Sequence, residues 1–304
     1  MKLSAGCVAG GAENRKPLLG GACCDTRKVV IVALESQEFE YLRQFLAHHS
    51  AVMLDEGKGY LAESRLTPLA YREGMDSVQE LLEHIRKTSF DDLHRKVLDA
   101  MMNNETWFFR DHLPFEALRR VILPELLADR AALQRLNIWS AASSSGQEAY
   151  SIAMMIQEEF GGLPGWTISI LGTDLSSAIL ERARSGRYSQ LEINRGLPAK
   201  YLAKYFTRDG SDWILSPVIR SKVEFRELNL ATQWDNLPRF DTVFFRNVLI
   251  YFEVEKKREM FSRIVSTMKP DGYLLLGAAE TTYGLSERFV RISWDKTAYF
   301  RPKM

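Results

Sequence analysis

After Leu136, short apolar runs alternate with segments of helical periodicity, and this alternation constrains the fold more than any other feature. The runs NIWSA, TISILGTD, KVEFREL, RFDTVFFRN and GYLLLGA are interspersed with helical patterns at 148–160, 176–184 and 254–268. Parallel strands joined by crossover helices have this pattern, so we expect an α/β fold with a doubly wound sheet. The tail, RFVRISWDKTAYFRP, alternates without a helix and is expected to add an antiparallel hairpin at one edge.

The chain before this region has only helical periodicity. Between residues 36 and 102 apolar residues recur at helix spacing, as in Leu42, Phe45 and Leu46. We therefore expect an all-α N-terminal domain over residues 29–102 and an α/β domain over 103–304. An Asp-Gly turn signal between two short extended runs predicts a small antiparallel β insertion at about 205–220. Residues 1–28, with their Gly and Ala, are expected to form a disordered extension.

Charge and composition exclude several classes of function. The chain has 40 basic and 39 acidic residues, without the basic excess typical of proteins that bind nucleic acid. No apolar run is long enough to span a bilayer, so no direct membrane insertion is expected. Cys7, Cys23 and Cys24 are the only cysteines and lack partners at zinc-ligand spacing. We expect no metal site, and a disulfide-free body indicates a reducing compartment.

Small and acidic residues follow the first two predicted strands. WSAASSSGQE lets the backbone pass close to a ligand, and Asp174 ends the second strand, where a carboxylate can accept hydrogen bonds from a ribose. Gly146 is the only glycine of the first loop, so the glycine-rich turn that a dinucleotide pyrophosphate needs is absent. An adenosine ligand without phosphate is favoured, with S-adenosylmethionine the obvious candidate. Alternatively, the loop is an ordinary tight turn and Asp174 only caps the next helix.

The run FFRNVLIYF has a strongly polar centre. Its strand is expected to enter the core through Val243 and Phe245 and to emerge at the ligand face with Arg246 and Asn247. Tyr251 would lie beyond the strand and face the same cleft. The alternative is an arginine neutralised by a nearby carboxylate, with Tyr251 as a half-buried packing ring.

The motifs NNETWFFRD, WSAASSSGQEAYSIAM, ILGTD, SGRY and FFRNVLIYF resemble, in order and spacing, those of the chemotaxis receptor glutamate O-methyltransferases, the CheR family. The resemblance covers residues 36–302. It implies an all-α domain followed by a Rossmann-like S-adenosylmethionine-dependent methyltransferase sheet with a small antiparallel β insertion. It also implies a cytoplasmic bacterial protein-glutamate O-methyltransferase, which forms glutamate methyl esters and S-adenosylhomocysteine.

The resemblance also implies roles for individual residues. Those around the cofactor would be Asn104, Thr106, Arg110, Glu148, Asp174, Asn229, Leu230, Phe245, Arg246 and Asn247. Glu148 would meet the charged methionyl part and Asp174 the ribose. Arg110 and Tyr251 would be the catalytic residues, nearest the transferred methyl group. No general base is required, because the substrate carboxylate is already ionised at neutral pH.

The expected partner is the cytoplasmic helical bundle of a methyl-accepting chemotaxis receptor, contacted through Lys58, Arg65 and Arg72. In some family members the β insertion also binds a pentapeptide at the receptor C-terminus. Here the hairpin turns within 208–212, and Pro217 removes a donor from a possible edge strand. We therefore expect no pentapeptide tether, and a monomeric enzyme.

Two other classes of function are compatible with the predicted fold. A non-catalytic sensor of S-adenosylmethionine or S-adenosylhomocysteine would be indicated by loss of Arg110 or Tyr251, and both are present. Methylation of RNA or a small molecule on the same fold is disfavoured, because the charge is near neutral and a helical domain suits a protein surface better.

Overall fold

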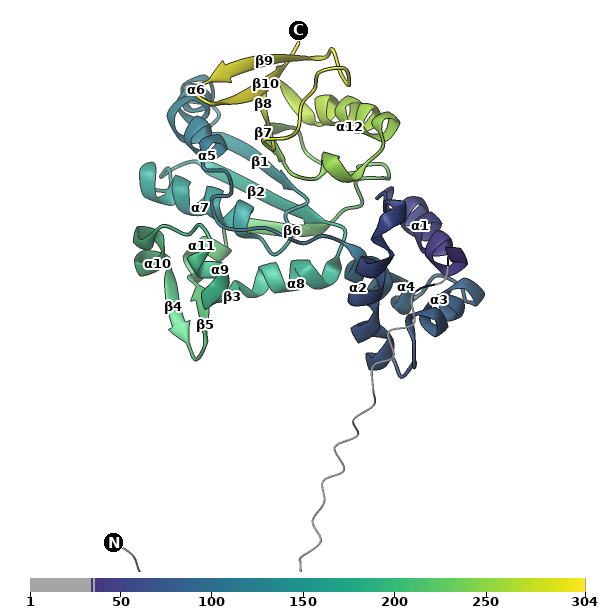
Figure 1. Ribbon diagram of the computed structural model, residues 1–304. Helices are drawn as coiled ribbons and strands as arrows, with labels where there is room; N and C mark the ends of the chain where they lie inside the picture. The colour runs from purple at the N-terminus through teal and green to yellow at the C-terminus, as the bar shows by residue number, and fades with distance from the viewer. Residues whose placement is uncertain (1–33, 35, 304) are drawn as a thin grey trace, which may run out of the picture. The chain divides into compact units, whose positions relative to one another are not determined.

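The computed structural model describes residue 34 and residues 36–303, which belong to one compact unit (Figure 1). The predicted disordered extension at 1–28 lies outside the described residues.

The first elements are helical, as predicted. They are α1 (Ser36–Ser50), the 3-10 helix η1 (Glu56–Lys58), α2 (Gly59–Arg72), α3 (Val78–Lys87) and α4 (Asp92–Met101). The helices begin where side chains satisfy free backbone donors: Ser77 accepts the N–H of Glu80, and Asp91 forms a capping box with His94. The periodic leucines bury one face of each helix in a common core that is separate from the cores of the sheet.

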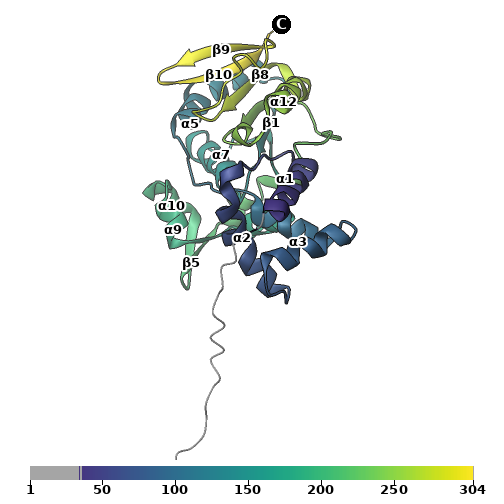
Figure 2. The ribbon, with the colours of Figure 1, turned by 45° about the vertical axis from the view of Figure 1, so that its right-hand side comes forward.

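A seven-stranded sheet follows, in the order β6-β2-β1-β7-β8-β10-β9. Its strands are β1 (Arg135–Ala141), β2 (Thr167–Asp174), β6 (Val223–Glu227), β7 (Phe240–Phe245), β8 (Met268–Leu276), β9 (Phe289–Trp294) and β10 (Thr297–Pro302). The first five are parallel. Strand β10 pairs antiparallel with both β8 and β9 (Figure 2). The predicted doubly wound sheet with an antiparallel edge hairpin is confirmed. Strand order reverses at β1, which places the switch point between β1 and β7.

Helices connect the strands and cover the sheet. They are α5 (Leu113–Ala117), the π-helical turn η2 (Leu118–Ile122), α6 (Leu123–Asp129), α7 (Gln147–Glu159), α8 (Ser177–Ser185), η3 (Leu249–Tyr251) and α12 (Val254–Thr267). Because side chains alternate along a strand, Phe244 and Phe245 enter different cores. Phe244 belongs to the core that contains α7, and Phe245 to the core that contains α12.

The β insertion is larger than predicted. A three-stranded sheet has the order β3-β5-β4, formed by β3 (Arg187–Ser189), β4 (Phe206–Asp209) and β5 (Asp212–Leu215), with α9 (Gln190–Asn194), α10 (Ala199–Tyr205) and α11 (Pro217–Arg220) (Figure 1). The β4–β5 hairpin turns at Gly210 and Ser211. The third strand of this sheet, β3, comes from the SGRY motif and pairs with β5. Pro217 was expected to remove a donor from a possible edge strand, but it lies in no strand. It begins α11 instead, because Ser216 caps that helix and proline suits its first turn.

In the part of the chain that is described, no helix is both long enough and apolar enough to cross a membrane.

Candidate active site

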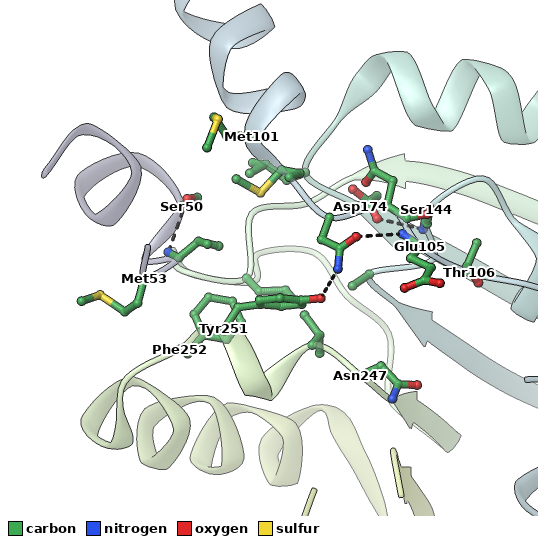
Figure 3. Close-up of a pocket in the computed structure, with 18 of the residues that line it drawn as sticks. Ser50, Met53, Met101, Glu105, Thr106, Ser144, Asp174, Asn247, Tyr251 and Phe252 are labelled. Carbon is green, nitrogen blue, oxygen red and sulfur yellow. Dashed lines mark hydrogen bonds between the residues drawn. The ribbon is translucent and has the colours of Figure 1, made fainter. Parts of the chain in front are cut away.

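A pocket of about 240 Å³ lies at the carboxyl ends of β1, β2, β6 and β7 (Figure 3). Its other wall comes from the helical region, with residues of the loop after α1, of α2 and of the α4 C-terminus. Open α/β sheets bind ligands at this edge, next to the switch point, so the pocket has the position expected for a cofactor site.

The structure brings most of the predicted site residues together in this pocket. The predicted residues that line it are Asn104, Thr106, Arg110, Glu148, Asp174, Asn229, Leu230, Arg246, Asn247 and Tyr251. Phe245 is the exception. Its side chain is fully buried in the core, with ring centroids 6.1 Å from both Trp139 and Trp234. Strand alternation turns this side chain away from the pocket, so the prediction that it closes the pocket is not supported.

The loop after β1 approaches the ligand region in a left-handed conformation. Ala142 and Ser144 both have φ near +50°, and Gly146 has φ +90°. A Cβ atom at position 146 would lie 2.9 Å from the Phe225 ring and 3.0 Å from the Ala183 Cβ, so only glycine fits there. The loop is also joined to the NNET segment, because the Ser144 hydroxyl donates a 2.8 Å hydrogen bond to the Asn104 carbonyl.

Asp174 is buried at the end of β2, between two turns. Its Oδ2 accepts the N–H of Ser144 at 2.8 Å, and its Oδ1 accepts the N–H of Ser176 at 3.2 Å (Figure 3). Burial raises the pKa of this carboxyl group above its usual value, and the backbone hydrogen bonds oppose that shift. The carboxylate thus fixes the strand-to-helix turn, as in the alternative interpretation. It also lines the pocket with acceptor capacity to spare.

Arg246 lies at the polar centre of FFRNVLIYF, and its guanidinium group is buried. Its side chain is 1% exposed and pairs with Glu148 at 2.7 Å and Asp111 at 2.8 Å. It also donates to the Arg110 carbonyl at 2.7 Å, while the Ser140 hydroxyl donates to the second Glu148 oxygen at 2.8 Å. Two carboxylates therefore neutralise the charge, as the alternative interpretation required. The same pairing joins three segments of the pocket wall.

Arg110 lies in a strained segment. Its neighbours Phe109 and Asp111 have φ of +53° and +62°, a conformation that residues other than glycine rarely adopt. The guanidinium lies 4.3 Å from the Trp107 ring centroid, and its Nη1 donates to the Glu105 carbonyl at 2.8 Å. Its Nε is buried without a hydrogen-bond partner among the described residues. One donor of Arg110 is therefore unsatisfied within the described part of the chain.

Tyr251 ends η3, lines the pocket and is joined both to the segment after α4 and to the loop after α1. The Asn103 side-chain amide donates to its hydroxyl at 2.7 Å (Figure 3), and Met53 N–H donates to its carbonyl at 2.9 Å. In a similar contact, the Asn229 amide donates to the His49 carbonyl at 2.7 Å. Asn103, Met53 and His49 were not predicted from the sequence, because nothing in their local pattern indicates a partner so far away in the chain.

The three basic residues expected to contact a receptor differ in their surroundings. Arg65 donates from Nη1 to the Met101 carbonyl at 2.6 Å, so it satisfies the C-terminus of α4 rather than standing free. Lys58 is exposed and pairs with Asp55 at 2.5 Å. Both line the pocket, whereas Arg72 is an exposed residue in the last turn of α2.

Two family models match the chain. Residues 37–102 match the all-alpha domain of CheR methyltransferases, and residues 104–298 match their SAM binding domain. The chain belongs to the CheR methyltransferase family. The family predicted from the sequence motifs is therefore confirmed, together with S-adenosylmethionine as the cofactor.

Named relatives cover nearly the whole chain. Chemotaxis protein methyltransferase 1 of Pseudomonas aeruginosa is 43% identical over 271 residues, which is 88% of this chain and 98% of that protein. Chemotaxis protein methyltransferase Cher2 of Pseudomonas putida is 42% identical with the same coverage of both chains. The chemotaxis protein methyltransferase of Vibrio parahaemolyticus is 38% identical over 90% of this chain and 99% of that protein.

A solved structure described as "DhpI-SAH complex structure" aligns with 64% of this chain and 72% of that chain, at 15% identity. The TM-score is 0.31, and this similarity supports no further conclusion.

Proposed function

We propose that this protein transfers a methyl group from S-adenosylmethionine to glutamate side chains in the cytoplasmic helical bundle of chemotaxis receptors. The products are glutamate methyl esters and S-adenosylhomocysteine. The observation that carries the proposal is the presence of Arg110 and Tyr251 in one pocket with the predicted cofactor residues. Relatives named chemotaxis protein methyltransferase, at up to 43% identity, support the same substrate class.

The pocket residues fit the proposed cofactor. S-adenosylmethionine supplies, when bound, an electrophilic methyl group on a sulfonium sulfur. Asp174 retains acceptor capacity for ribose hydroxyl groups beyond its two backbone hydrogen bonds. Glu148 adds negative charge on the same wall, although it shares that charge with Arg246. Asn229 and Leu230 line the pocket beyond β6, where the adenine would lie.

Arg110 and Tyr251 are proposed to orient the substrate carboxylate. The Arg110 side chain lines the pocket, and its guanidinium would donate a charge-assisted hydrogen bond to the carboxylate. The Tyr251 hydroxyl oxygen already accepts a hydrogen bond from Asn103, which leaves its own proton free to be donated. Neither residue needs to move a proton in the reaction. Alignment of this kind lowers barriers by several kcal/mol, about 7–11 in favourable intramolecular models.

Receptor recognition is proposed to be independent of a C-terminal pentapeptide. The β4–β5 hairpin has only Gly210 and Ser211 between its strands, and Arg187 pairs with Asp209 at 2.5 Å and with Asp212 at 3.2 Å beside the turn. A short, paired hairpin offers little room for an extended peptide. We also propose a cytoplasmic, monomeric enzyme, in line with the family resemblance.

The test is transfer of a tritiated methyl group from S-adenosylmethionine to a panel of receptor cytoplasmic fragments, with and without their C-terminal tails. We expect base-labile label on at least one fragment, equally in both forms. Tight binding of S-adenosylhomocysteine without transfer to any fragment would favour the sensor instead. Loss of transfer on removal of the tail would contradict the pentapeptide-independent mode.

A further inference from the structure

We propose that Glu280, which does not line the pocket, is a positioning residue for methyl transfer. Glu280 is half-buried in the segment after β8. Its Oε2 accepts the N–H groups of Asn247 at 2.7 Å and Gly277 at 2.8 Å. Its Oε1 accepts those of Val248 at 2.9 Å and Leu249 at 2.7 Å. One carboxylate thus satisfies four backbone donors from two neighbouring loops.

The three consecutive donors belong to the turn that carries the pocket residues. Asn247 and Val248 line the pocket, and Tyr251 follows two residues after Leu249 in the same 3-10 turn. Hydrogen bonds to an ionised acceptor are about twice as strong as neutral ones. The direction of this turn relative to the sheet, and hence the place of the Tyr251 ring, therefore depends on Glu280.

Gly277 provides a second, independent observation. A Cβ atom there would lie 2.7 Å from Oε2 of Glu280, 2.8 Å from Nδ2 of Asn247 and 2.9 Å from the Asn247 backbone nitrogen. Any side chain at position 277 would force these groups apart. Asn247 itself has φ +57°, a left-handed conformation that asparagine tolerates better than most residues. Position 277 thus permits the close packing that the carboxylate requires.

The inference rests on the proposed function, because its main readout is methyl transfer. Glu280→Gln keeps the size of the side chain but directs an amide group at backbone donors that need an acceptor. We expect kcat to fall about tenfold or more, since misplacements of about 1 Å can cost 10²-fold. Affinity for S-adenosylhomocysteine should fall less than kcat does, because Asn247 and Val248 are only two of the many residues that line the pocket. Gly277→Ala should likewise lower kcat more than it lowers the affinity for S-adenosylhomocysteine.

A matched control separates positioning from simple stabilisation. Glu192 is also half-buried and accepts a backbone N–H, that of Ser189 at 2.9 Å, but lies outside the pocket. Glu192→Gln should lower the melting temperature without lowering kcat of the folded protein.

A double variant tests whether Glu280 acts through Tyr251. Tyr251→Phe should lower kcat much less in the Glu280→Gln background than in the original chain, because the ring is already misplaced.

Hydrogen exchange gives a readout that needs no substrate. In Glu280→Gln the amides of residues 247–249 should exchange faster, while those of the β1–α7 loop are unchanged. Unaltered exchange at 247–249 would overturn the inference. So would a kcat equal to that of the original chain, or additive effects of Glu280→Gln and Tyr251→Phe. Absence of methyl transfer by the original chain would instead refute the proposed function, and the exchange experiment would still decide the role of Glu280.

Discussion

The side-chain amide of Asn103 donates a 2.7 Å hydrogen bond to the hydroxyl oxygen of Tyr251, 148 residues further along the chain. This contact joins the segment that follows the helical region to the turn that follows β7. A hydroxyl that accepts one hydrogen bond is oriented, and its own hydrogen must point elsewhere. The relationship explains why a tyrosine that need not act as a base can still influence the reaction.

Tyr251→Phe should slow methyl transfer about tenfold while affinity for S-adenosylhomocysteine stays nearly unchanged, because one oriented hydrogen bond is lost, worth roughly 1–1.5 kcal/mol. Steady-state kinetics and calorimetry check both expectations. The pH–rate profile of the original chain should show no steep rise in the alkaline range. Such a rise would make Tyr251 a general base and contradict the proposed role.

Arg110→Ala should nearly abolish turnover, because the substrate carboxylate loses its charged donor. Arg110→Lys should restore little of the lost turnover, because an ammonium group lacks the planar set of donors and stacks less well on the Trp107 ring. The control is Arg208→Ala in the exposed hairpin, which should leave turnover intact. Single-turnover methyl transfer is the measurement, and substantial activity in Arg110→Ala would exclude it from catalysis.

Asp174→Ala should weaken S-adenosylhomocysteine binding by roughly 1–3 kcal/mol, because ribose hydroxyl groups lose a buried acceptor.

Asp174 also predicts that cofactor binding depends on pH. Burial raises the pKa of Asp174, so its carboxylate takes up a proton at a higher pH than an ordinary aspartate does. Cofactor affinity should therefore decline on acidification, beginning above the usual aspartate range, and the decline should vanish in Asp174→Ala. Calorimetry at several pH values would show whether binding is instead independent of pH.

Arg246→Ala should destabilise the fold by about 3–5 kcal/mol, because it leaves two carboxylates near each other without their buried partner. Arg226→Ala removes an exposed pair with Glu224 and should cost less than about 1 kcal/mol. Denaturant unfolding of both variants gives the comparison. Equal effects would show that the Arg246 pairs contribute no more than surface charges do.

The sequence was most informative where local pattern determines local structure. Leu42 and its periodic neighbours predicted helices, and the change to polar residues at Arg246 and Asn247 located the point where β7 leaves the core. Phe245 was misplaced because the family resemblance was applied to a side chain that strand alternation directs inward. Asn103, Asp111 and Glu280 were missed for a different reason. Each acts through a partner far along the chain, and periodicity carries no information about such pairings.

The walls of the pocket come from stretches near residues 50–54, 101–106, 228–230 and 246–252, far apart in sequence. A cofactor that fills this pocket would contact them together, and the unfolded chain has no such site. At a concentration one hundred times its dissociation constant, a ligand adds about 2.7 kcal/mol to the free energy of unfolding. A cell short of the methyl donor would then expose more of these chains to proteolysis.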